Sequence, residues 1–385
     1  MPDLVVAGAG MAGLVAAAEA RGLGAEVLVF EKLEYPGGSM RLSSGVIWRH
    51  RDFARFRAEC PRGEERLQRT LFERLDADLA WLERLGAPLT ERETGNPLTT
   101  GVRFEPRALT DALVAAAGGL RPRDGVGGRG PSDGAGVVTG SALLEPPRRA
   151  PLILATGGFA ADRRLLREHV TPEAEHVLLR TAPGSTGDGL RLGLAAGATT
   201  GPGLDEVYAR AMPAPPARVA PEDFVRLAQL YARHAEVRNE RGEHFEAANA
   251  EPRALGRSEC LRLWSEIDVA QWMARQPRAR AWLRVPRALL GERVRERTVG
   301  DMVEAAAAVG APVRREPDHV TVETVAGITT TLGGLRVDEH ARAAPDVFAC
   351  GADAGGVATG GYASGLAAAL VFGRIAARAA LGATP

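Results

Sequence analysis

Residues 3–31 read DLVVAGAGMAGLVAAAEARGLGAEVLVFE, and this stretch decides the fold. Leu4–Ala7 is a short apolar run with the length and branching of a buried parallel strand. The alanine-rich segment that follows Gly13 is typical of a helix. Val27–Phe30 is a second apolar run, and it ends at Glu31. The stretch therefore predicts a strand, a helix and a second parallel strand, which together form the βαβ unit of an α/β protein.

Three glycines in GxGxxG spacing join the first strand to the helix. Gly8 suits a tight turn, Gly10 lets the backbone approach a pyrophosphate, and Gly13 allows close packing of helix on strand. Free N–H groups and the helix dipole favour an anion at this N-terminus. Glu31 lies about 20 residues downstream, where a carboxylate binds a ribose 2′-hydroxyl. An acid there argues against a 2′-phosphate, so the pattern favours FAD or NAD over NADP; a βαβ unit without a nucleotide is the alternative.

Composition and charge exclude several classes of protein. The chain has 385 residues, 45% of them hydrophobic and 25% charged, which is ordinary for a globular protein with room for two domains. Its net charge of zero favours neither nucleic acid nor an anionic membrane surface as a partner. The longest apolar segment, 366–381, is interrupted by two arginines, so no membrane insertion is expected. Lys32 is the only lysine, which excludes Schiff-base chemistry elsewhere in the chain.

The three cysteines are Cys60, Cys260 and Cys350, which are far apart in the sequence and lack CxxC spacing. This usage predicts neither a disulfide framework nor a zinc site, and no pair of histidines has metal-ligand spacing. We therefore expect a cytoplasmic protein that uses no metal.

Further segments extend the α/β pattern along the chain. The loop at 37–48 combines paired glycines with small hydroxyl residues, so it can lie along a flat ligand; an ordinary polar loop is the alternative. Residues 152–159 predict a buried strand that ends in a glycine turn, and Thr171-Pro172 has the pattern of a helix start. Helices are also expected at 51–85, 109–117, 188–196 and, after a glycine-dense loop, 366–381.

The composition changes after Gly203. Residues 208–326 hold much of the charge and few strand signals, which favours a mainly helical second domain inserted into the first. The predicted ranges are 1–203 for the first part of the nucleotide-binding domain, 204–328 for the inserted domain, and 329–385 for the second part of the nucleotide-binding domain.

Taken in order, these segments resemble the flavoprotein family of fumarate reductase and succinate dehydrogenase, whose relatives include tricarballylate dehydrogenase and the 3-ketosteroid dehydrogenases. The resemblance covers nearly the whole chain and follows the family's order. The matching pieces are Gly8 to Gly13, Gly37-Gly38-Ser39, Ser44-Gly45, Ala155 to Phe159, Gly187-Asp188-Gly189 with Ala196-Gly197-Ala198, Asn239 to Phe245, Gly333-Gly334 and Gly355 to Arg374.

The resemblance implies an α/β fold, in which a Rossmann-like FAD-binding domain (a parallel sheet with flanking helices) carries an inserted, mainly helical α+β capping domain. It also implies FAD as the cofactor, with substrate held between the two domains. The residues that would bind FAD are Gly8, Gly10, Ala12, Gly13, Glu31, Lys32, Gly38, Ser39, Ser44, Gly45, Ala155, Thr156, Gly157, Asp188, Gly351, Asp353, Gly365 and Leu366.

Three positions depart from the family's pattern. A histidine follows the paired glycines in members that bind FAD covalently; here Ser39 and Met40 stand there, so FAD should be bound non-covalently. Ala352 occupies the position of a family glutamate, and the neighbouring Asp353 is expected to take over its contact with the ribityl chain. His244 replaces an arginine of the Gly-Glu-Arg-Phe motif, and the sequence does not explain this change.

Members of this family move a hydride between flavin N5 and one carbon of a C–C bond beside a carbonyl or carboxylate. The resemblance therefore implies an FAD-dependent oxidoreductase, a dehydrogenase or reductase of CH–CH groups, that forms or reduces a C=C bond α,β to a carbonyl or carboxylate. Its partners would be a small-molecule substrate and an unidentified electron donor or acceptor. The alternatives are a flavin oxidase or monooxygenase that uses O₂, and a non-catalytic flavin electron-carrier subunit.

Four residues are candidates for catalysis. Arg253 lies one residue from the position of the arginine that handles the proton in fumarate reductases; a surface arginine is the alternative. Thr330 and Tyr362 stand where those enzymes place a histidine and an arginine that clamp substrate carboxylates, so a C4-dicarboxylate is disfavoured. Tyr362 is suited to hydrogen-bond a substrate carbonyl, or else only packs on the flavin. His234 lies in the inserted segment, where substrate contacts arise; a histidine without a catalytic role is the alternative.

Overall fold

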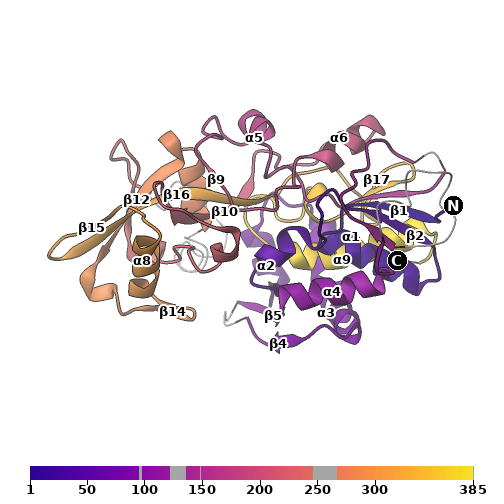
Figure 1. Ribbon diagram of the computed structural model, residues 1–385, viewed down its shortest axis with the longest axis horizontal. Helices are drawn as coiled ribbons and strands as arrows, with labels where there is room; N and C mark the ends of the chain where they lie inside the picture. Colours follow the sequence, from indigo (N-terminus) through magenta and orange to yellow (C-terminus); the bar gives the residue numbers. More distant parts are fainter. Residues whose placement is uncertain (95–97, 122–135, 148, 246–266, 385) are drawn as a thin grey trace. The chain divides into compact units, whose positions relative to one another are not determined.

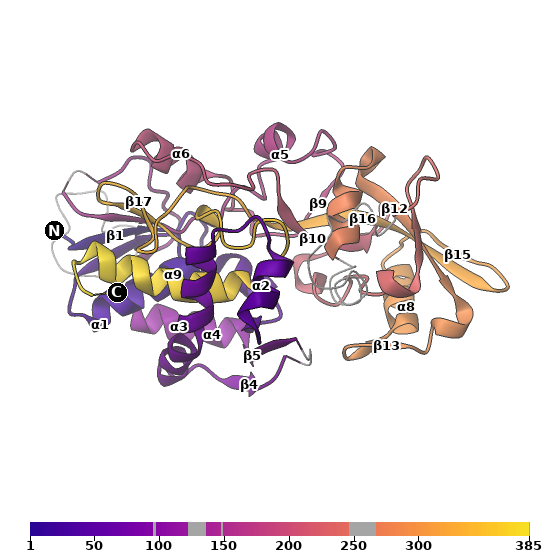
Figure 2. The ribbon, with the colours of Figure 1, turned by 180° about the vertical axis from the view of Figure 1, so that it is seen from behind.

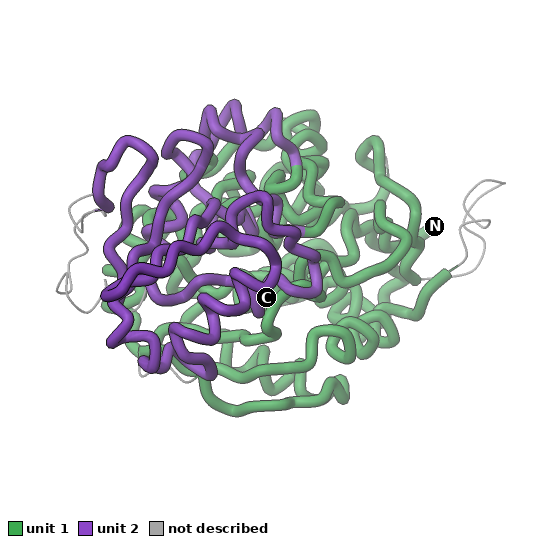
Figure 3. Tube along the Cα trace, turned by 60° about the vertical axis from the view of Figure 1, so that its left-hand side comes forward, with its two compact units in different colours: residues 1–161, 182–204, 331–385 green, residues 162–181, 205–330 purple. Residues whose placement is uncertain are grey.

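The computed structural model describes residues 1–94, 98–121, 136–147, 149–245 and 267–384. The chain forms two compact units, shown in different colours in Figure 3. Unit 1 comprises residues 1–161, 182–204 and 331–385, and unit 2 comprises residues 162–181 and 205–330. Residues 162–181 therefore belong to the second unit, whereas the sequence-based ranges had placed them in the first. Arg253 lies outside the described residues.

A seven-stranded sheet forms the centre of unit 1 (Figure 1). Its strands pair in parallel, apart from the antiparallel pair β17 and β18 at one edge. Every residue of β1 is buried, as expected for a strand covered on both faces. The predicted parallel α/β sheet is thus confirmed. In order across the sheet the strands are β17 (Arg342–Ala344), β18 (Val347–Ala349), β8 (Leu152–Leu154), β1 (Leu4–Ala7), β2 (Val27–Phe30), β7 (Gly136–Val138) and β6 (Leu120–Arg121).

Helices pack on this sheet and on one another. α1 (Met11–Gly22) packs against α9 (Gly365–Ala380) and α4 (Pro106–Ala116), and α3 (Glu65–Arg84) packs on α9 (Figure 2). The leucines of α3 that recur at helical spacing are buried, so α3 is the covering helix that this spacing predicts.

Shorter elements complete unit 1. The helix expected at 51–85 is interrupted at residues 60–64, where Pro61 and Gly63 stand. The helix expected at 109–117 begins earlier, because Glu105 caps it and Pro106 occupies its first turn. A three-stranded antiparallel sheet has the order β3–β5–β4. The remaining elements are β3 (Val46–His50), β5 (Thr99–Phe104), β4 (Leu89–Glu91), α2 (Phe53–Glu59), α6 (Asp188–Ala195), η1 (Gly38–Leu42) and η8 (Gly351–Asp353).

A buried cluster of charged side chains joins three helices of unit 1. Arg374 on α9 donates to Glu19 on α1 at 2.9 Å and also to Asp78 on α3. Arg378, one turn further along α9, donates to the other oxygen of Glu19 at 2.7 Å. Burial acts to raise the pKa of Glu19, but the hydrogen bonds and charges of the two arginines outweigh it and lower this pKa. At Asp78 burial prevails and raises the pKa.

Unit 2 is built on a sheet around the long strand β16. β12 and β15 pair antiparallel with β16, β9 pairs with it in parallel, and β11 pairs antiparallel with β12. β13 and β14 form a separate hairpin. The strands are β9 (Leu178–Leu179), β10 (Val207–Pro213), β11 (Glu236–Arg238), β12 (Arg280–Pro286), β13 (Arg293–Val294), β14 (Arg297–Thr298), β15 (Val313–Arg315) and β16 (His319–Thr331).

Helices and short turns accompany this sheet in the part of unit 2 that the structure describes. They are α5 (Arg163–His169), a helix at 267–274, α8 (Val299–Ala308) and the short turns η3 (Pro221–Asp223), η4 (Ala232–His234), η6 (Pro277–Ala279) and η7 (Arg287–Leu289). Since six strands form its sheet, the described part of unit 2 has mixed helix and strand content, as an α+β domain does, with more strands than the few strand signals of the sequence suggested. The helix start expected at Thr171-Pro172 is a turn, in which the Thr171 hydroxyl donates to the carbonyl of Ala274.

Candidate functional site

The turn between β1 and α1 is packed at backbone contact distance. Gly8 has a φ of 101°, and a Cβ atom there would lie 2.2 Å from the carbonyl oxygen of Ala155. A Cβ atom on Gly13 would lie 1.9 Å from the carbonyl oxygen of Gly8. Ala12 is buried beside them, and a Cβ atom on Gly351 would lie 2.9 Å from its methyl group. Glycine at positions 8 and 13 therefore closes the helix onto the strand, as the motif predicts.

The N-terminus of α1 is open on one side. Gly10 is its N-cap residue, no side chain of the described residues caps its free N–H groups, and its first turn contains no acid. A Cβ atom on Gly10 would meet no atom of the described residues within 4 Å, and Gly38 of the paired glycines lies beside it. Free N–H groups next to an open stretch of backbone fit a pyrophosphate, so the residues present suit FAD.

Glu31 ties the glycine turn to the end of β2. Its two carboxylate oxygens accept hydrogen bonds from the N–H groups of Ala9 and Leu33, both at 2.8 Å. Burial raises the pKa of Glu31, while the two backbone hydrogen bonds and the charge of Lys32 oppose this shift. Each oxygen retains acceptor capacity, so the carboxylate can also bind the ribose hydroxyl that the sequence predicts.

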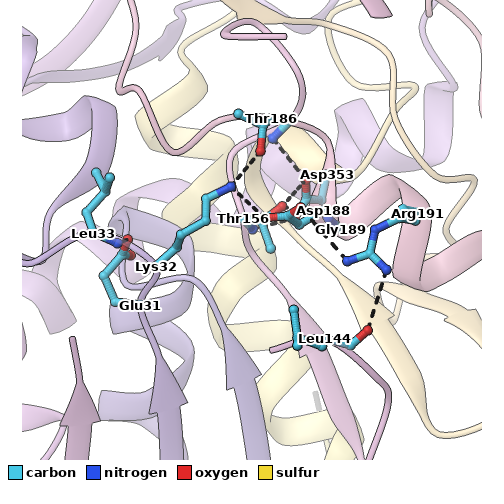
Figure 4. A network of polar contacts seen from close by, with 11 residues as sticks. Glu31, Lys32, Leu33, Leu144, Thr156, Thr186, Asp188, Gly189, Arg191 and Asp353 are labelled. Atoms are coloured by element: carbon cyan, nitrogen blue, oxygen red, sulfur yellow. Dashed lines mark hydrogen bonds and ion pairs between the residues drawn. The ribbon is translucent and has the colours of Figure 1, made fainter. Parts of the chain in front are cut away.

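Lys32 connects the end of β2 with the first turn of α6. Its Nζ donates to Thr186 Oγ1 at 2.5 Å and to Asp188 Oδ2 at 2.7 Å. Figure 4 shows this side chain reaching across to both partners, with Arg191 on the far side of Asp188. The structure therefore brings together Lys32 and Asp188, two residues 156 positions apart that the sequence assigned to one cofactor.

If Lys32 lies against FAD, bound FAD should protect it from acylation. At an FAD concentration about ten times Kd we expect roughly tenfold slower labelling, because only the free protein exposes the amine. Mass spectrometry after treatment with acetic anhydride measures this directly, since Lys32 is the only lysine. The N-terminal amine of the same molecule is the control. Equal labelling of Lys32 with and without FAD would contradict its assignment to the site.

The turn after β8 meets η8. Thr156 and Gly158 donate to the carboxylate of Asp353, which is 2% exposed. Burial raises the pKa of this carboxyl group, while those hydrogen bonds oppose the shift. Gly157 has a φ of 92°, and a Cβ atom there would lie 3.0 Å from Ser185 Oγ. Ala155 continues the pairing of β8 with β1 through its N–H group.

The remaining predicted FAD residues lie on two segments of unit 1. Ser39 Oγ accepts a hydrogen bond from the N–H of Ala182 at 3.0 Å. Ser44 is exposed, and Gly45 is buried against the carbonyl of Phe104. Gly365 and Leu366 begin α9, whose N-terminus is capped by Ser364. The assignment of these residues to FAD stays a prediction.

The catalytic candidates belong to different units. Tyr362 lies in unit 1 between η8 and α9, and its ring centroid is 5.8 Å from that of Trp48 on β3. Thr330 is on β16 and His234 is on η4, both in unit 2. Burial and the charge of Arg233 lower the pKa of His234, whose Nε2 accepts a hydrogen bond from Arg233 at 2.9 Å. The catalytic roles stay predictions, and that of Arg253 concerns a residue outside the described ones.

Sequence reasoning left two contributors out of the site. Thr186 binds Lys32, and Gly158 binds Asp353. Each lies within two positions of a predicted residue in the sequence, but its partner is more than 150 residues away, so the sequence did not assign it to the site.

Two kinds of feature were not found in the part of the chain that the structure describes. No group of three His, Cys, Asp or Glu side chains there is arranged to hold a metal ion. No helix among those residues is both long and apolar enough to span a membrane.

A family model described as the FAD binding domain matches residues 3–147 and 134–366 of the chain. None of the curated proteins matches its sequence. The resemblance drawn from the motifs is thereby confirmed for the family, and FAD is the cofactor that this family binds.

Solved structures share the fold at low sequence identity. A flavocytochrome c3 fumarate reductase in an open conformation matches with a TM-score of 0.67 and 19% identity, over 99% of this chain and 78% of that chain. The 3-ketosteroid Δ4-(5α)-dehydrogenase of Rhodococcus jostii matches with a TM-score of 0.64 and 19% identity, over 99% of this chain and 96% of that one. The 3-ketosteroid Δ1-dehydrogenase of Sterolibacterium denitrificans matches with a TM-score of 0.64 and 15% identity, over 99% of each chain.

Proposed function

Because this chain belongs to the FAD binding domain family, we propose that it is an FAD-dependent oxidoreductase that forms or reduces a C=C bond α,β to a carbonyl group. The fold that it shares with a fumarate reductase and two ketosteroid dehydrogenases supports this class of reaction. The observation that carries the choice of a carbonyl is Tyr362, a hydroxyl-bearing side chain where the fumarate reductases have an arginine.

In the proposed mechanism, FAD supplies hydride transfer at N5 when it is bound. The chain's own residues bind and orient the substrate and move a proton. Tyr362 donates its hydroxyl proton in a hydrogen bond to the substrate carbonyl oxygen, which stabilises the negative charge that develops there. The aromatic contact with Trp48 holds the Tyr362 ring in place. Arg253, which is ordinarily protonated, gives or receives the proton on the neighbouring carbon, alone or with an acid.

The direct test is an anaerobic one. Protein reduced with dithionite is offered a panel of enones and of unsaturated acids, and reoxidation of the bound flavin is followed by absorbance. Reoxidation by enones supports the proposal. Reoxidation by unsaturated acids alone would replace the carbonyl with a carboxylate, and reoxidation by O₂ alone would favour an oxidase or monooxygenase. An electron-carrier subunit would exchange electrons only with a protein or dye partner.

Replacement of Tyr362 by phenylalanine should lower the rate of enone reduction about 100-fold, because one donor to the developing oxyanion is lost. The ring and its contact with Trp48 are kept, so FAD content should stay at the wild-type level. Stopped-flow measurement of flavin reoxidation gives the rate, and the flavin absorbance gives the FAD content. An unchanged rate in Tyr362→Phe would mean that the ring only packs.

A further inference from the structure

Asp353 is a buried carboxylate that accepts three hydrogen bonds from one turn of the chain. Its Oδ1 accepts from Thr156 Oγ1 at 3.1 Å and from the N–H of Gly158 at 2.9 Å. Its Oδ2 accepts from the N–H of Thr156. Figure 4 shows Asp353 between this turn and the first turn of α6. All three partners are donors, which favours the ionised form of the carboxyl group.

The remaining side of the carboxylate is covered by the backbone of α6. A Cβ atom on Gly189 would lie 2.2 Å from Asp353 Oδ2 and 2.5 Å from its Cγ. A carboxylate has about four acceptor positions. Three of them take protein hydrogen bonds and Gly189 covers the fourth side, which leaves little space for a ribityl hydroxyl. The arrangement therefore favours a supporting role for Asp353 over the direct contact with the ribityl chain that the sequence predicted.

Thr156 connects Asp353 to the N-terminus of α6 through hydrogen bonds. Its hydroxyl donates to Asp353 and accepts a hydrogen bond from the N–H of Gly189 at 2.8 Å. The N-cap residue of α6 is Gly187, which has no side chain to cap the free N–H groups. Thr156 thus supplies the cap from another segment. From the opposite side, Lys32 holds Asp188, the first residue of α6.

We propose that Asp353 is a positioning residue for FAD: its carboxylate fixes the turn after β8 and the first turn of α6 in the arrangement that receives the cofactor, without contacting it. The inference rests on FAD binding by this family and is independent of the reaction proposed above. It assigns to Asp353 a role that acts through Thr156, Gly158 and Gly189.

Protonation of Asp353 should weaken this arrangement. A protonated oxygen would become a donor that faces other donors, so one hydrogen bond of the turn would be lost. Two titratable groups lie nearby. The charge of Asp188 on α6 raises the pKa of Asp353. The pKa of the Cys350 thiol is itself raised, by burial and by the charge of Asp353. Burial raises the pKa of Asp353 further. FAD affinity should therefore fall as the pH falls. This fall should begin at a higher pH than it would for an aspartate with an ordinary pKa.

The test is FAD titration of the apoprotein, followed by quenching of flavin fluorescence between pH 5 and 8. In Asp353→Asn the side-chain amide faces donors, and we expect Kd to rise about 10- to 100-fold at pH 7.5. The pH dependence of Kd seen in the wild type should disappear. Asp338→Asn is the matched control, because the carboxylate of Asp338 also accepts two backbone N–H bonds, at 2.9 and 2.8 Å, outside the site.

A second pair of variants keeps the test decisive if Asp353→Asn folds poorly. Thr156→Val removes the connecting hydroxyl and should raise Kd about tenfold, whereas Thr156→Ser keeps the hydroxyl and should restore affinity to within about threefold. A wild-type Kd in both Asp353→Asn and Thr156→Val would overturn the proposal. So would a variant Kd that keeps the wild-type pH dependence, because the carboxylate would then act only in folding. Failure of the wild type to bind FAD at all would instead refute the cofactor assignment.

Discussion

Replacement of Arg374 by methionine is expected to lower the free energy of unfolding by about 3–5 kcal/mol. Arg374 is 12% exposed, and it donates to two carboxylates that are 5% and 1% exposed, Glu19 and Asp78. Methionine preserves much of the side-chain volume but leaves both buried carboxylates with weaker partners. Among the described residues, Glu19 would keep Arg378 and Asp78 would keep Arg74, at 3.9 Å. Urea unfolding followed by tryptophan fluorescence measures the loss.

The pH dependence of this loss separates a charge effect from a packing effect. In Arg374→Met the folded-state pKa values of Glu19 and Asp78 should both lie well above their unfolded values. Protonation of these two carboxylates then reduces the variant's loss of stability as the pH falls from 7 toward about 4. In the wild type the pKa of Glu19 is lowered, so its contribution is present above the unfolded pKa and is lost as the pH falls. At Glu19 both trends narrow the difference between the two proteins in acid. At Asp78 the wild-type pKa is already raised, so only its further rise in the variant narrows the difference.

A variant of an exposed arginine supplies the control. Arg69 lies on α3 and is 50% exposed, with ion pairs to Glu65 and Glu73. Arg69→Met should change the free energy of unfolding by no more than about 1 kcal/mol. A deficit in Arg374→Met that stays constant from pH 7 to pH 4 would show that lost packing, rather than unpaired charge, causes the instability.

Local constraints explain why the first βαβ unit could be predicted. Gly8 has a positive φ, and Gly13 is packed against a carbonyl oxygen. Because both positions require glycine, the spacing of these glycines indicates the geometry of the turn. The final helix was also predicted from its own residues, although the sequence analysis did not identify Ser364 as the residue that caps it. Such features depend on few residues, and the sequence shows all of them.

The extent of the sheet in unit 2 was not predicted, although its pattern was present in the sequence. Residues 280–286 alternate between buried and partly exposed positions, which is the period of a strand with one covered face. The interpretation relied instead on the high charge of the segment. In β12, however, Arg280 and Arg284 occupy two of the four partly exposed positions, and Arg280 pairs with Glu323 of β16. Charge on alternate positions therefore signalled a half-buried strand and not a solvated helix.

The sequence named the segments that meet around Lys32, Asp188 and Asp353, but not the contacts between them. These three residues were each assigned to FAD through the resemblance to the flavoprotein family. Their partners come from segments 150 to 200 residues away, so pairing depends on the strand order of the sheet. The role of Asp353 as a support for Thr156 could not be read from its neighbours, because only the folded chain places Gly189 against it.

Replacement of Gly10 by alanine is expected to weaken FAD binding at least 100-fold while the apoprotein stays folded. Gly10 has a φ of −77° and a ψ of −171°, an extended conformation that any residue adopts. In the part of the chain that the structure describes, a Cβ atom there would meet no atom within 4 Å. The added methyl group would instead occupy the side from which a pyrophosphate approaches the N-terminus of α1. Fluorescence titration gives Kd, and thermal unfolding of the apoprotein gives its stability.

Two further alanine variants on the same helix show which physical effect operates. Gly22→Ala, at the end of α1 with no atom within 4 Å of the new Cβ, should leave Kd unchanged and add up to about 1 kcal/mol of stability. Gly13→Ala should instead destabilise the apoprotein, because its Cβ would lie 1.9 Å from the carbonyl oxygen of Gly8. Gly10→Ala should cost the apoprotein no more than about 1 kcal/mol, the difference between glycine and alanine at an N-cap.

Neither backbone strain nor packing within the protein explains why residue 10 is a glycine. A ligand that needs close approach to the backbone does explain it, and the three variants separate these causes. If Gly10→Ala bound FAD as tightly as the wild type, the open side of this helix N-terminus would not be where the pyrophosphate lies. The cofactor would then have to be held chiefly by the segments around Glu31, Lys32 and Asp188.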